Sequence, residues 1–432
     1  MKKSECPDYR VFIGFVDTAG YFSGLAKGFD DLEVSVVFAS VNSNPFQYAE
    51  RPSSNFFVRL LKWSYSALSK HKRFSFLSNV FFVIHAVSRL LALLWSLFYF
   101  DVYIFSGCDT FLRGYDLPLL RACGKKIIFV FLGSSTRPPY LNGATVSKQR
   151  GISLDDCIRA TARTKNIVVR YTQYADHVIE HPPCGHFQVR PFLAFLAMGF
   201  PFTAPEVESR DIKKDGVRIL HAPSFPECKG SEVFREVITE LRQRGFTIEY
   251  VEMINRSHNE VLQEIQRCDF VLDEIYSDSL LGGLGTEAAF YGRPTIVSGY
   301  VTPSDFVSMP HVTSLPPALH VLPDEIFSAV QRLIEDSVLR ESLGAAARQF
   351  VRSHWAPVEV AKRFDALLSG RSKAEWYYSP SSISYLYGWG LSRNAVRTLV
   401  RSMIQSGGVE TLCLSDKPKL ESCFVTFSEE CD

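Results

Sequence analysis

The sequence predicts an α/β protein with two doubly wound domains and a C-terminal extension. Short apolar runs alternate with helical patterns of 3.6-residue period in both halves of the chain, which indicates parallel strands joined by covering helices. A length of 432 residues allows two or three domains, and 46% hydrophobic residues are enough for their cores. The predicted domains are residues 1–200 and 217–369, with a linker at 201–216 and the extension at 370–432.

Composition and cysteine spacing exclude several classes of protein. The formal net charge of +1 argues against a nucleic-acid-binding protein. Ten cysteines occur without a Cys-x-x-Cys pair, which favours reduced thiols over a disulfide framework or a zinc site. The first apolar run, residues 11–16, is too short for the core of a signal peptide. We therefore expect a cytoplasmic protein with no metal and no nucleic-acid partner.

The stretch 217–300 shows the alternation of strands and helices most clearly. Strands are predicted at 219–221, 248–253, 269–273 and 295–297. One helix starts at Ser231 and stops at Gly245, a short one covers 261–265, and another starts at Thr286 and stops at Gly292. Ligands of open parallel sheets bind at the carboxyl ends of the strands. The loops after these strands are therefore the expected site.

Two of these loops carry residues suited to a nucleotide diphosphate. Lys229 lies in an open loop after the first strand, and the glycine-rich loop 282–285 precedes the helix that begins with Thr286 and Glu287. A helix N-terminus presents free amides and a partial positive charge to phosphate. A carboxylate can accept hydrogen bonds from two hydroxyls at once.

This order of motifs resembles the donor-binding domain of GT-B glycosyltransferases, closest to the family-4-like group, also described as glycosyl transferases group 1. The resemblance rests on residues 219–224, 229–230, 269, 285–288 and 292–294. It implies two Rossmann-like domains that face a cleft, and a C-terminal segment that crosses back onto the first domain.

The resemblance also implies roles for single residues. The donor diphosphate would be held by Lys229 and by the backbone of the glycine loop, which comprises Gly283, Leu284, Gly285 and Thr286. Glu287 would hold the ribose hydroxyls. The family's helix glutamate usually has a partner glutamate eight residues earlier, and this chain has Ser279 there, with Asp278 beside it.

The N-terminal half opens with a strand, a glycine turn and a helix. The strand at 11–16 leads to Gly20, whose amide we expect at the donor phosphate, because this unit resembles the first unit of a GT-B acceptor domain. Further strands are predicted at 34–39, 101–105, 126–131 and 176–181, with a helix at about 155–174.

Residues 51–100 contain no Asp or Glu and are unusual for a soluble domain. Aromatic residues alternate there with the cations Arg51, Arg59, Lys62, Lys70, Lys72 and Arg73. This mixture suits the surface of an anionic bilayer. Residues 80–100 are strongly apolar but hold His85 and Arg89, so we expect a long buried or interfacial helix rather than a membrane span. The alternative is an ordinary core helix with a solvated basic face.

Two residues are weak candidates for catalysis. Arg137 follows the strand at 126–131, and His181 ends the strand at 176–181, so both are expected at the cleft end of the first sheet. Neither can be assigned as a catalytic base from the sequence.

The resemblance implies transfer of a sugar from a nucleoside-diphosphate sugar to a hydroxyl of a saccharide or lipid-linked acceptor. Retention of configuration, no metal or cofactor, and a place in bacterial surface-polysaccharide or glycolipid assembly at the inner face of the membrane are further expectations. Two alternatives stay open. A sugar-nucleotide epimerase would share the architecture and would use Glu287 with His181. A nucleotide-sugar-binding protein without catalysis would explain Ser279 and Leu132, which stand where relatives are often polar.

Overall fold

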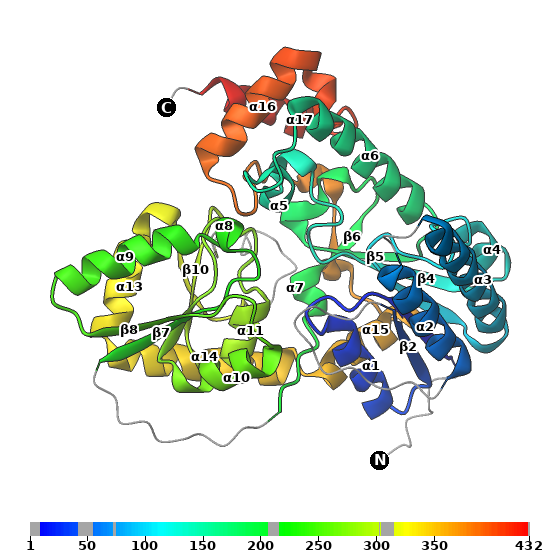
Figure 1. The fold of residues 1–432 in the computed structure, drawn as a ribbon, viewed down its shortest axis with the longest axis horizontal. Helices are drawn as coiled ribbons and strands as arrows, with labels where there is room; N and C mark the ends of the chain where they lie inside the picture. Colours follow the sequence, from blue (N-terminus) through cyan, green and yellow to red (C-terminus); the bar gives the residue numbers. More distant parts are fainter. Residues whose placement is uncertain are drawn as a thin grey trace.

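Two β-sheets, each covered by helices, form the two halves of the molecule (Figure 1). The computed structural model describes residues 9–41, 55–71, 75–205, 216–301, 303 and 315–430. The first sheet has the strand order β12-β6-β5-β4-β3-β1-β2, and the second has the order β11-β10-β9-β7-β8. In both sheets the chain starts in the strand next to one edge, forms that edge strand and then crosses back to wind toward the other edge. The predicted class, α/β with two doubly wound domains, is confirmed.

The first sheet is built from parallel strands with one antiparallel addition at its edge. Its strands are β1 (Val11–Phe15), β2 (Val36–Ser40), β3 (Val102–Ser106), β4 (Lys126–Val130), β5 (His177–Glu180), β6 (Phe192–Ala194) and the antiparallel β12 (Tyr377–Tyr378). Its main helices are α1 (Tyr21–Asp31), α2 (Phe56–Lys70), α3 (Ser75–Tyr99), α4 (Leu117–Ala122) and α6 (Leu154–Thr172), and short helices are α5 (Gly143–Val146) and α7 (Phe195–Met198). Successive strand residues alternate between two cores: Phe12 and Tyr103 face one, whereas Ile13 and Ile104 face the other.

The second sheet is entirely parallel. Its strands are β7 (Val217–His221), β8 (Ile248–Glu252), β9 (Phe270–Leu272), β10 (Thr295–Ser298) and β11 (Leu319–Val321). Its helices are α8 (Pro226–Lys229), α9 (Ser231–Gln243), α10 (His258–Arg267), α11 (Gly283–Phe290), α13 (Ile326–Glu335) and α14 (Ser337–His354). The stripe predicted for the helix after Ser231 is buried at Phe234, Ile238 and Leu241, which face the core beneath α9 and α13.

The chain returns to the first domain through α15 (Pro357–Leu368), which lies against α1 (Figure 1). Phe364 of α15 packs edge-to-face on Phe29 of α1, with ring centroids 6.2 Å apart. Gly28 lets the two helices approach, because a Cβ there would lie 2.0 Å from the carbonyl oxygen of Pro357. The chain therefore returns to the first domain within residues 217–369, the range that was predicted for the second domain.

Residues beyond α15 add to the first domain. After β12, the helices α16 (Arg393–Gly407) and α17 (Pro418–Glu429) pack near α6 (Figure 1). Val400, Met403 and Phe424 belong to the same core as Phe12 and Tyr103 of the first sheet.

The helix predicted at residues 80–100 exists as the longer α3, and most of its length is not covered by protein. Residues 76–99 form the one described segment whose length and composition would allow a membrane crossing. Three of the cations in the basic stretch, Arg51, Lys72 and Arg73, lie outside the described residues, as does the charged run 206–215 of the predicted linker.

The close approach of α1 and α15 gives a test of the return to the first domain. We expect Gly28→Ala to lower the free energy of unfolding by about 1–3 kcal/mol, because the added methyl group forces the helices apart. Asp31→Ala, at the exposed end of α1, is the control and should stay within about 0.5 kcal/mol of wild type. Thermal melting of the three proteins measures this, and equal melting temperatures would contradict the contact.

Candidate functional site

The carboxyl ends of the two sheets face one cavity of about 400 Å³. The first domain contributes residues 17–19, which follow β1. The second contributes residues 222–224 after β7, Met253, Asn255 and Arg256 after β8, and Asp273 after β9, with further residues from α8, α10 and α11. In each sheet the winding direction reverses beside the first strand, β1 or β7, which is where ligands bind in open α/β sheets. The volume is in the range of small-molecule sites.

Lys229 lines this cavity from the end of the short helix α8, where the sequence had predicted an open loop. The next residue, Gly230, has φ of 75°, and a Cβ there would lie 2.9 Å from the Cβ of Ile275, so glycine is required at this turn. The ammonium group of Lys229 pairs with Glu274 and lies 3.7 Å from Oδ1 of Asp273. Burial opposes its charged form, but the two carboxylates outweigh burial and raise the pKa of Lys229 above its ordinary value.

Asp273 and Glu274 were not predicted as site residues. Both are buried, and Glu274 also accepts hydrogen bonds from Nε1 of Trp389 at 2.9 Å and from Oγ of Ser277 at 2.6 Å. The carboxylate of Asp273 lies against the backbone of Gly282, where a Cβ would be 2.8 Å from Oδ2. Burial raises the pKa of Asp273, and the charge of Lys229 opposes this. The sequence indicated that these two residues could belong to the site only through their position directly after β9.

The glycine loop forms the first turn of α11, whereas the sequence predicted that the helix starts at Thr286. Gly282 is the extended N-cap residue, and the hydroxyl of Thr286 donates back to its carbonyl oxygen at 2.8 Å. Gly283 and Leu284 line the cavity, but Gly285 and Thr286 do not. The turn is therefore part of the cavity wall, and two of its four predicted residues contribute to that wall.

Loop 17–19 of the first domain lies against this turn of the second domain. A Cβ at Gly283 would lie 3.7 Å from the Cβ of Ala19. Gly20, expected at the phosphate, is instead the N-cap of α1 with φ of 75° and does not line the cavity. Its neighbours Asp17 and Thr18 do.

Glu287 is buried and lines the cavity, and it is held by a histidine that the sequence analysis missed. Nε2 of His258 lies 2.8 Å from Oε1 of Glu287. His258 is the first residue of α10, and the capping box between Ser257 and Glu260 fixes the start of that helix. Since His258 and Glu287 are 29 positions apart, only the folded chain brings them together.

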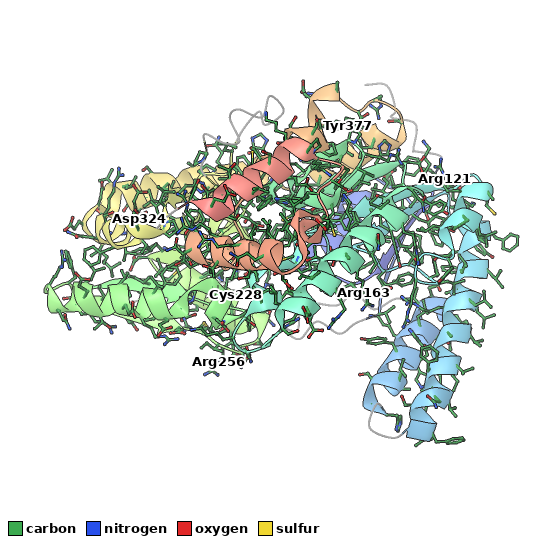
Figure 2. The ribbon with its side chains drawn as sticks, turned by 90° about the horizontal axis from the view of Figure 1, so that it is seen from above. Arg121, Arg163, Cys228, Arg256, Asp324 and Tyr377 are labelled. Atoms are coloured by element: carbon green, nitrogen blue, oxygen red, sulfur yellow. The ribbon has the colours of Figure 1, made fainter. Side chains whose placement is uncertain are left out.

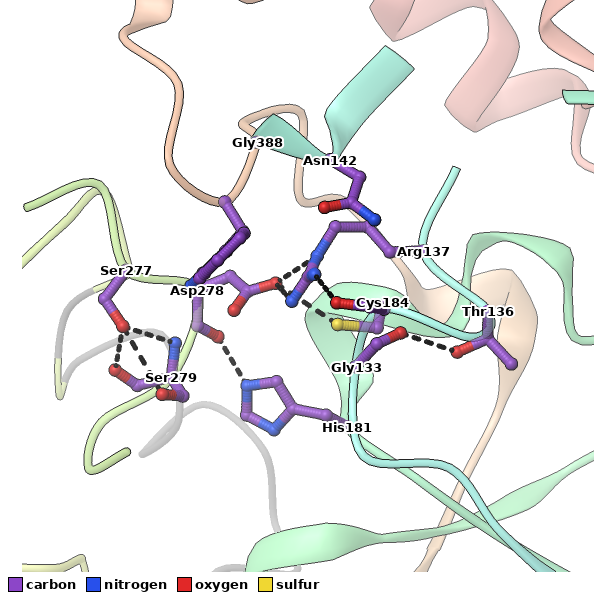
Figure 3. Close-up of polar contacts among 12 residues, drawn as sticks. Gly133, Thr136, Arg137, Asn142, His181, Cys184, Ser277, Asp278, Ser279 and Gly388 are labelled. Atoms are coloured by element: carbon purple, nitrogen blue, oxygen red, sulfur yellow. Dashed lines mark hydrogen bonds and ion pairs between the residues drawn. The ribbon is translucent and has the colours of Figure 1, made fainter. Parts of the chain in front are cut away.

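Arg137 and His181 do not line the cavity. They belong to an interdomain cluster with Cys184 and Asp278 (Figure 3). Nε and Nη2 of Arg137 donate to Oδ2 of Asp278 at 2.8 and 2.6 Å, and His181 donates from Nε2 to the carbonyl oxygen of Asp278. Sγ of Cys184 lies 3.2 Å from the same carboxylate. Asp278 lies next to Ser279, which stands at the position of the family's usual partner glutamate. In this chain Asp278 binds residues of the other domain.

The charge of Asp278 is set by this cluster. Burial opposes ionisation of its carboxyl group, but the guanidinium of Arg137 outweighs burial and lowers the pKa of Asp278. Removing one partner of such a buried pair leaves an uncompensated charge, which costs about 3–5 kcal/mol. The cluster therefore holds the two domains together beside the cavity.

No protein-family model and no curated protein matches the chain. Several solved structures are similar to it. The catalytic domain of starch synthase IV from Arabidopsis thaliana, bound to ADP and acarbose, aligns over 84% of this chain and 99% of its own with 10% identity and a TM-score of 0.48. Anabaena HepE in complex with UDP and glucose gives the same coverage and identity and a TM-score of 0.46. A putative UDP-N-acetylglucosamine 2-epimerase from Listeria monocytogenes covers 84% and 96% with 11% identity and a TM-score of 0.38.

At such identities the likeness concerns the fold alone. The architecture described above, two doubly wound domains whose strand ends face one cavity and a chain that returns to the first domain, is the GT-B fold that the sequence predicts.

The buried carboxyl group of Glu180, at the end of β5, gives the structure a pH dependence. It accepts hydrogen bonds from the amide of His181 at 3.0 Å and from Nε2 of Gln188 at 3.2 Å. Burial nevertheless raises the pKa of Glu180 to about 8. The folded state therefore keeps a proton that the unfolded chain loses near its ordinary pKa of 4.5.

We expect this proton to stabilise the fold fully below pH 4.5 and its contribution to be lost as the pH rises to about 8. Glu180→Gln cannot ionise, so its melting temperature should fall less than that of wild type between pH 5 and pH 8. Glu341→Gln, at an exposed position of α14, should follow the wild-type curve. Melting curves across this range measure the difference, and parallel curves for Glu180→Gln and wild type would contradict it.

Proposed function

We propose that the protein is a glycosyltransferase that moves a sugar from a nucleoside-diphosphate sugar to an acceptor hydroxyl. One observation carries the proposal: the cavity between the domains unites Glu287, Lys229 and the first turn of α11. The epimerase predicted from the sequence needs another arrangement, whereas a nucleotide-sugar-binding protein would use the same cavity. An epimerase acting through Glu287 and His181 loses support, because Glu287 bonds His258 and His181 bonds Asp278.

Each part of a nucleoside diphosphate has a partner in this proposal. The carboxylate of Glu287, oriented by His258, accepts hydrogen bonds from the ribose hydroxyls. The amides of Gly283 and Leu284, at the positive end of α11, bind the diphosphate. Such fixed donors stabilise the charge that develops on the leaving diphosphate.

Lys229 adds a full positive charge at the diphosphate. Its ammonium group has three N–H donors, so it can bind a phosphate oxygen while it stays paired with Glu274. Arg256 at the rim of the cavity is a second cation. These groups are the basis for proposing transfer without a metal or another cofactor.

The finer features of the reaction are also proposals. Retention of configuration, with a donor phosphate oxygen accepting the acceptor proton, rests on the family resemblance, and no side chain is assigned as the base. Neither Arg137 nor His181 is proposed as catalytic, because both act between the domains.

We further propose a lipid-linked saccharide as acceptor, in surface-polysaccharide or glycolipid assembly at the cytoplasmic face of the membrane. The exposed apolar side chains of α3 support a membrane-proximal acceptor. None of the eight described cysteines is in a disulfide, which agrees with a reducing compartment.

Product analysis tests the proposed activity. The protein is incubated with a panel of nucleotide sugars, each with and without saccharide and lipid-linked acceptors, and products are identified by mass spectrometry. Release of nucleoside diphosphate together with a glycosylated acceptor supports the transferase. A changed sugar without an acceptor would show an epimerase. Donor binding without any product would show a binding protein.

Glu287 gives a prediction on donor affinity. Loss of hydrogen bonds to a charged group costs about 1.5–3 kcal/mol, so Glu287→Ala should bind the nucleoside diphosphate roughly ten- to a hundredfold more weakly. Glu287→Gln keeps one acceptor oxygen and should lose less. Titration calorimetry measures both, using the diphosphate that most raises the melting temperature. Glu232→Ala, an exposed glutamate in the first turn of α9, is the matched control. Unchanged affinity in Glu287→Ala would remove the ribose assignment.

Lys229 gives a prediction that separates phosphate from nucleoside. Lys229→Ala should weaken binding of the nucleoside diphosphate and leave binding of the free nucleoside unchanged, because the ammonium contacts only phosphate. Lys229→Arg should rescue part of the loss, since a planar guanidinium does not occupy the position of a compact ammonium. Both variants also leave Asp273 and Glu274 with altered pairing, so melting curves must establish that the protein is folded during the titration. Equal losses for nucleoside and diphosphate would contradict the role.

A further inference from the structure

The helices α2 and α3 form a hairpin that extends from one end of the molecule, visible as the two blue helices in Figure 2. We call residues 55–71 and 75–99 the α2–α3 hairpin. Its helices pack on each other through Phe57 and Trp95, whose rings stack with centroids 5.1 Å apart, and through a 2.9 Å hydrogen bond between Oγ of Ser64 and Nδ1 of His85.

The side of α3 that faces away from α2 carries a stripe of exposed apolar side chains along the full helix. The stripe consists of Phe76, Val80, Val83, Val87, Leu90, Leu94 and Phe98, with Leu77, Phe82, Leu91 and Tyr99 beside it. The spacing of three and four residues places the stripe on one face. Phe76 and Phe98 are 79% and 80% exposed, at the two ends of a helix roughly 37 Å long. Soluble monomers rarely expose a contiguous apolar surface that runs along the whole length of such a helix.

The exposed side of α2 combines cations with aromatic rings. Phe56, Arg59, Trp63 and Lys70 are exposed and recur at helical spacing. Residues 51–100 include no acidic residue, so the hairpin carries positive charge only. Exposed apolar side chains on one helix, together with aromatic rings and cations on the other, match the boundary between acyl chains and anionic headgroups.

We propose that the α2–α3 hairpin binds the surface of an anionic bilayer, with the stripe of α3 inserted at the boundary between headgroups and acyl chains and the helix parallel to the membrane plane. The charge of the hairpin selects this occupant, because the exposed cations Arg59 and Lys70, with no acidic residue among residues 51–100, complement an anionic surface. The opposite side of α3 holds polar groups in the protein, His85 and Arg89, so the helix lies on the membrane rather than across it.

The hairpin has a fixed relation to the cavity. Arg89 of α3 pairs with Asp109 at 2.9 Å, and Asp109 follows β3 at the carboxyl edge of the first sheet. The guanidinium also lies 4.7 Å from the ring centroid of Phe15, the last residue of β1. The hairpin is therefore joined to the first domain at the carboxyl edge of its sheet, and membrane binding would place this domain at the bilayer. The inference does not depend on the proposed transferase activity.

Flotation of the full chain with lipid vesicles tests the proposal. Wild type should float with vesicles that contain phosphatidylcholine and phosphatidylglycerol, and much less with phosphatidylcholine alone. The triple variant Val83→Glu, Val87→Glu and Leu94→Glu should lose flotation, whereas Val338→Glu, at a 74% exposed valine of α14, should not. The pair Arg59→Gln and Lys70→Gln should weaken binding to the anionic vesicles roughly tenfold or more. Because all these positions are exposed, melting temperatures should stay near that of wild type.

Three results would overturn the inference. Wild type that does not float, or a triple variant that floats equally well, would show that the stripe does not bind lipid. A wild-type dimer that the triple variant disperses would show a second copy as the occupant. Resistance of membrane-bound protein to extraction with alkaline carbonate would show a helix that crosses the bilayer.

Discussion

The ion pair between Arg137 and Asp278 is the contact on which the cavity depends. Arg137 follows β4 of the first sheet and Asp278 follows β9 of the second, so the pair sets the separation of the two sets of strand ends. Trp389 of the C-terminal extension strengthens the same junction: its carbonyl oxygen accepts from the amide of Gly143 at 2.8 Å, and its indole donates to Glu274. The extension is thus part of the site's framework, because it ties both domains to one loop.

Charge balance is the second constraint on the cavity. Lys229 lies between Asp273 and Glu274, and both carboxylates are buried. This pairing keeps the ammonium charged and fixed in place, but it also offsets part of the charge available to a diphosphate. The amides of the first turn of α11 then carry more of the binding in the proposed function. The carboxylate of Asp273 packs against Gly282 and Gly285 and so helps to hold that turn in place.

The sequence predicted the fold well because its signals are local. Apolar runs and helical stripes mark buried strands and amphipathic helices, and glycines such as Gly230 mark required turns. Lys229 and Glu287 could be located for the same reason, since each lies next to a recognisable turn. His258 and Trp389 could not, because their partners Glu287 and Glu274 are distant in sequence. Arg137 and His181 were expected at the cleft end of their strands, but periodicity does not reveal that Asp278 meets them there. The sequence predicted a buried or interfacial helix at residues 80–100 and could not separate these two, because the pattern of an apolar helix is the same whether protein or lipid covers it.

A crystal structure with a bound nucleoside diphosphate would show whether the cavity is the donor site. We expect the nucleotide to occupy the cavity between the domains, with the ribose hydroxyls within hydrogen-bonding distance of the Glu287 carboxylate. We expect the diphosphate at the amides of Gly283 and Leu284 and at the ammonium group of Lys229. A nucleotide bound elsewhere, or one in the cavity whose phosphates point away from α11, would contradict it.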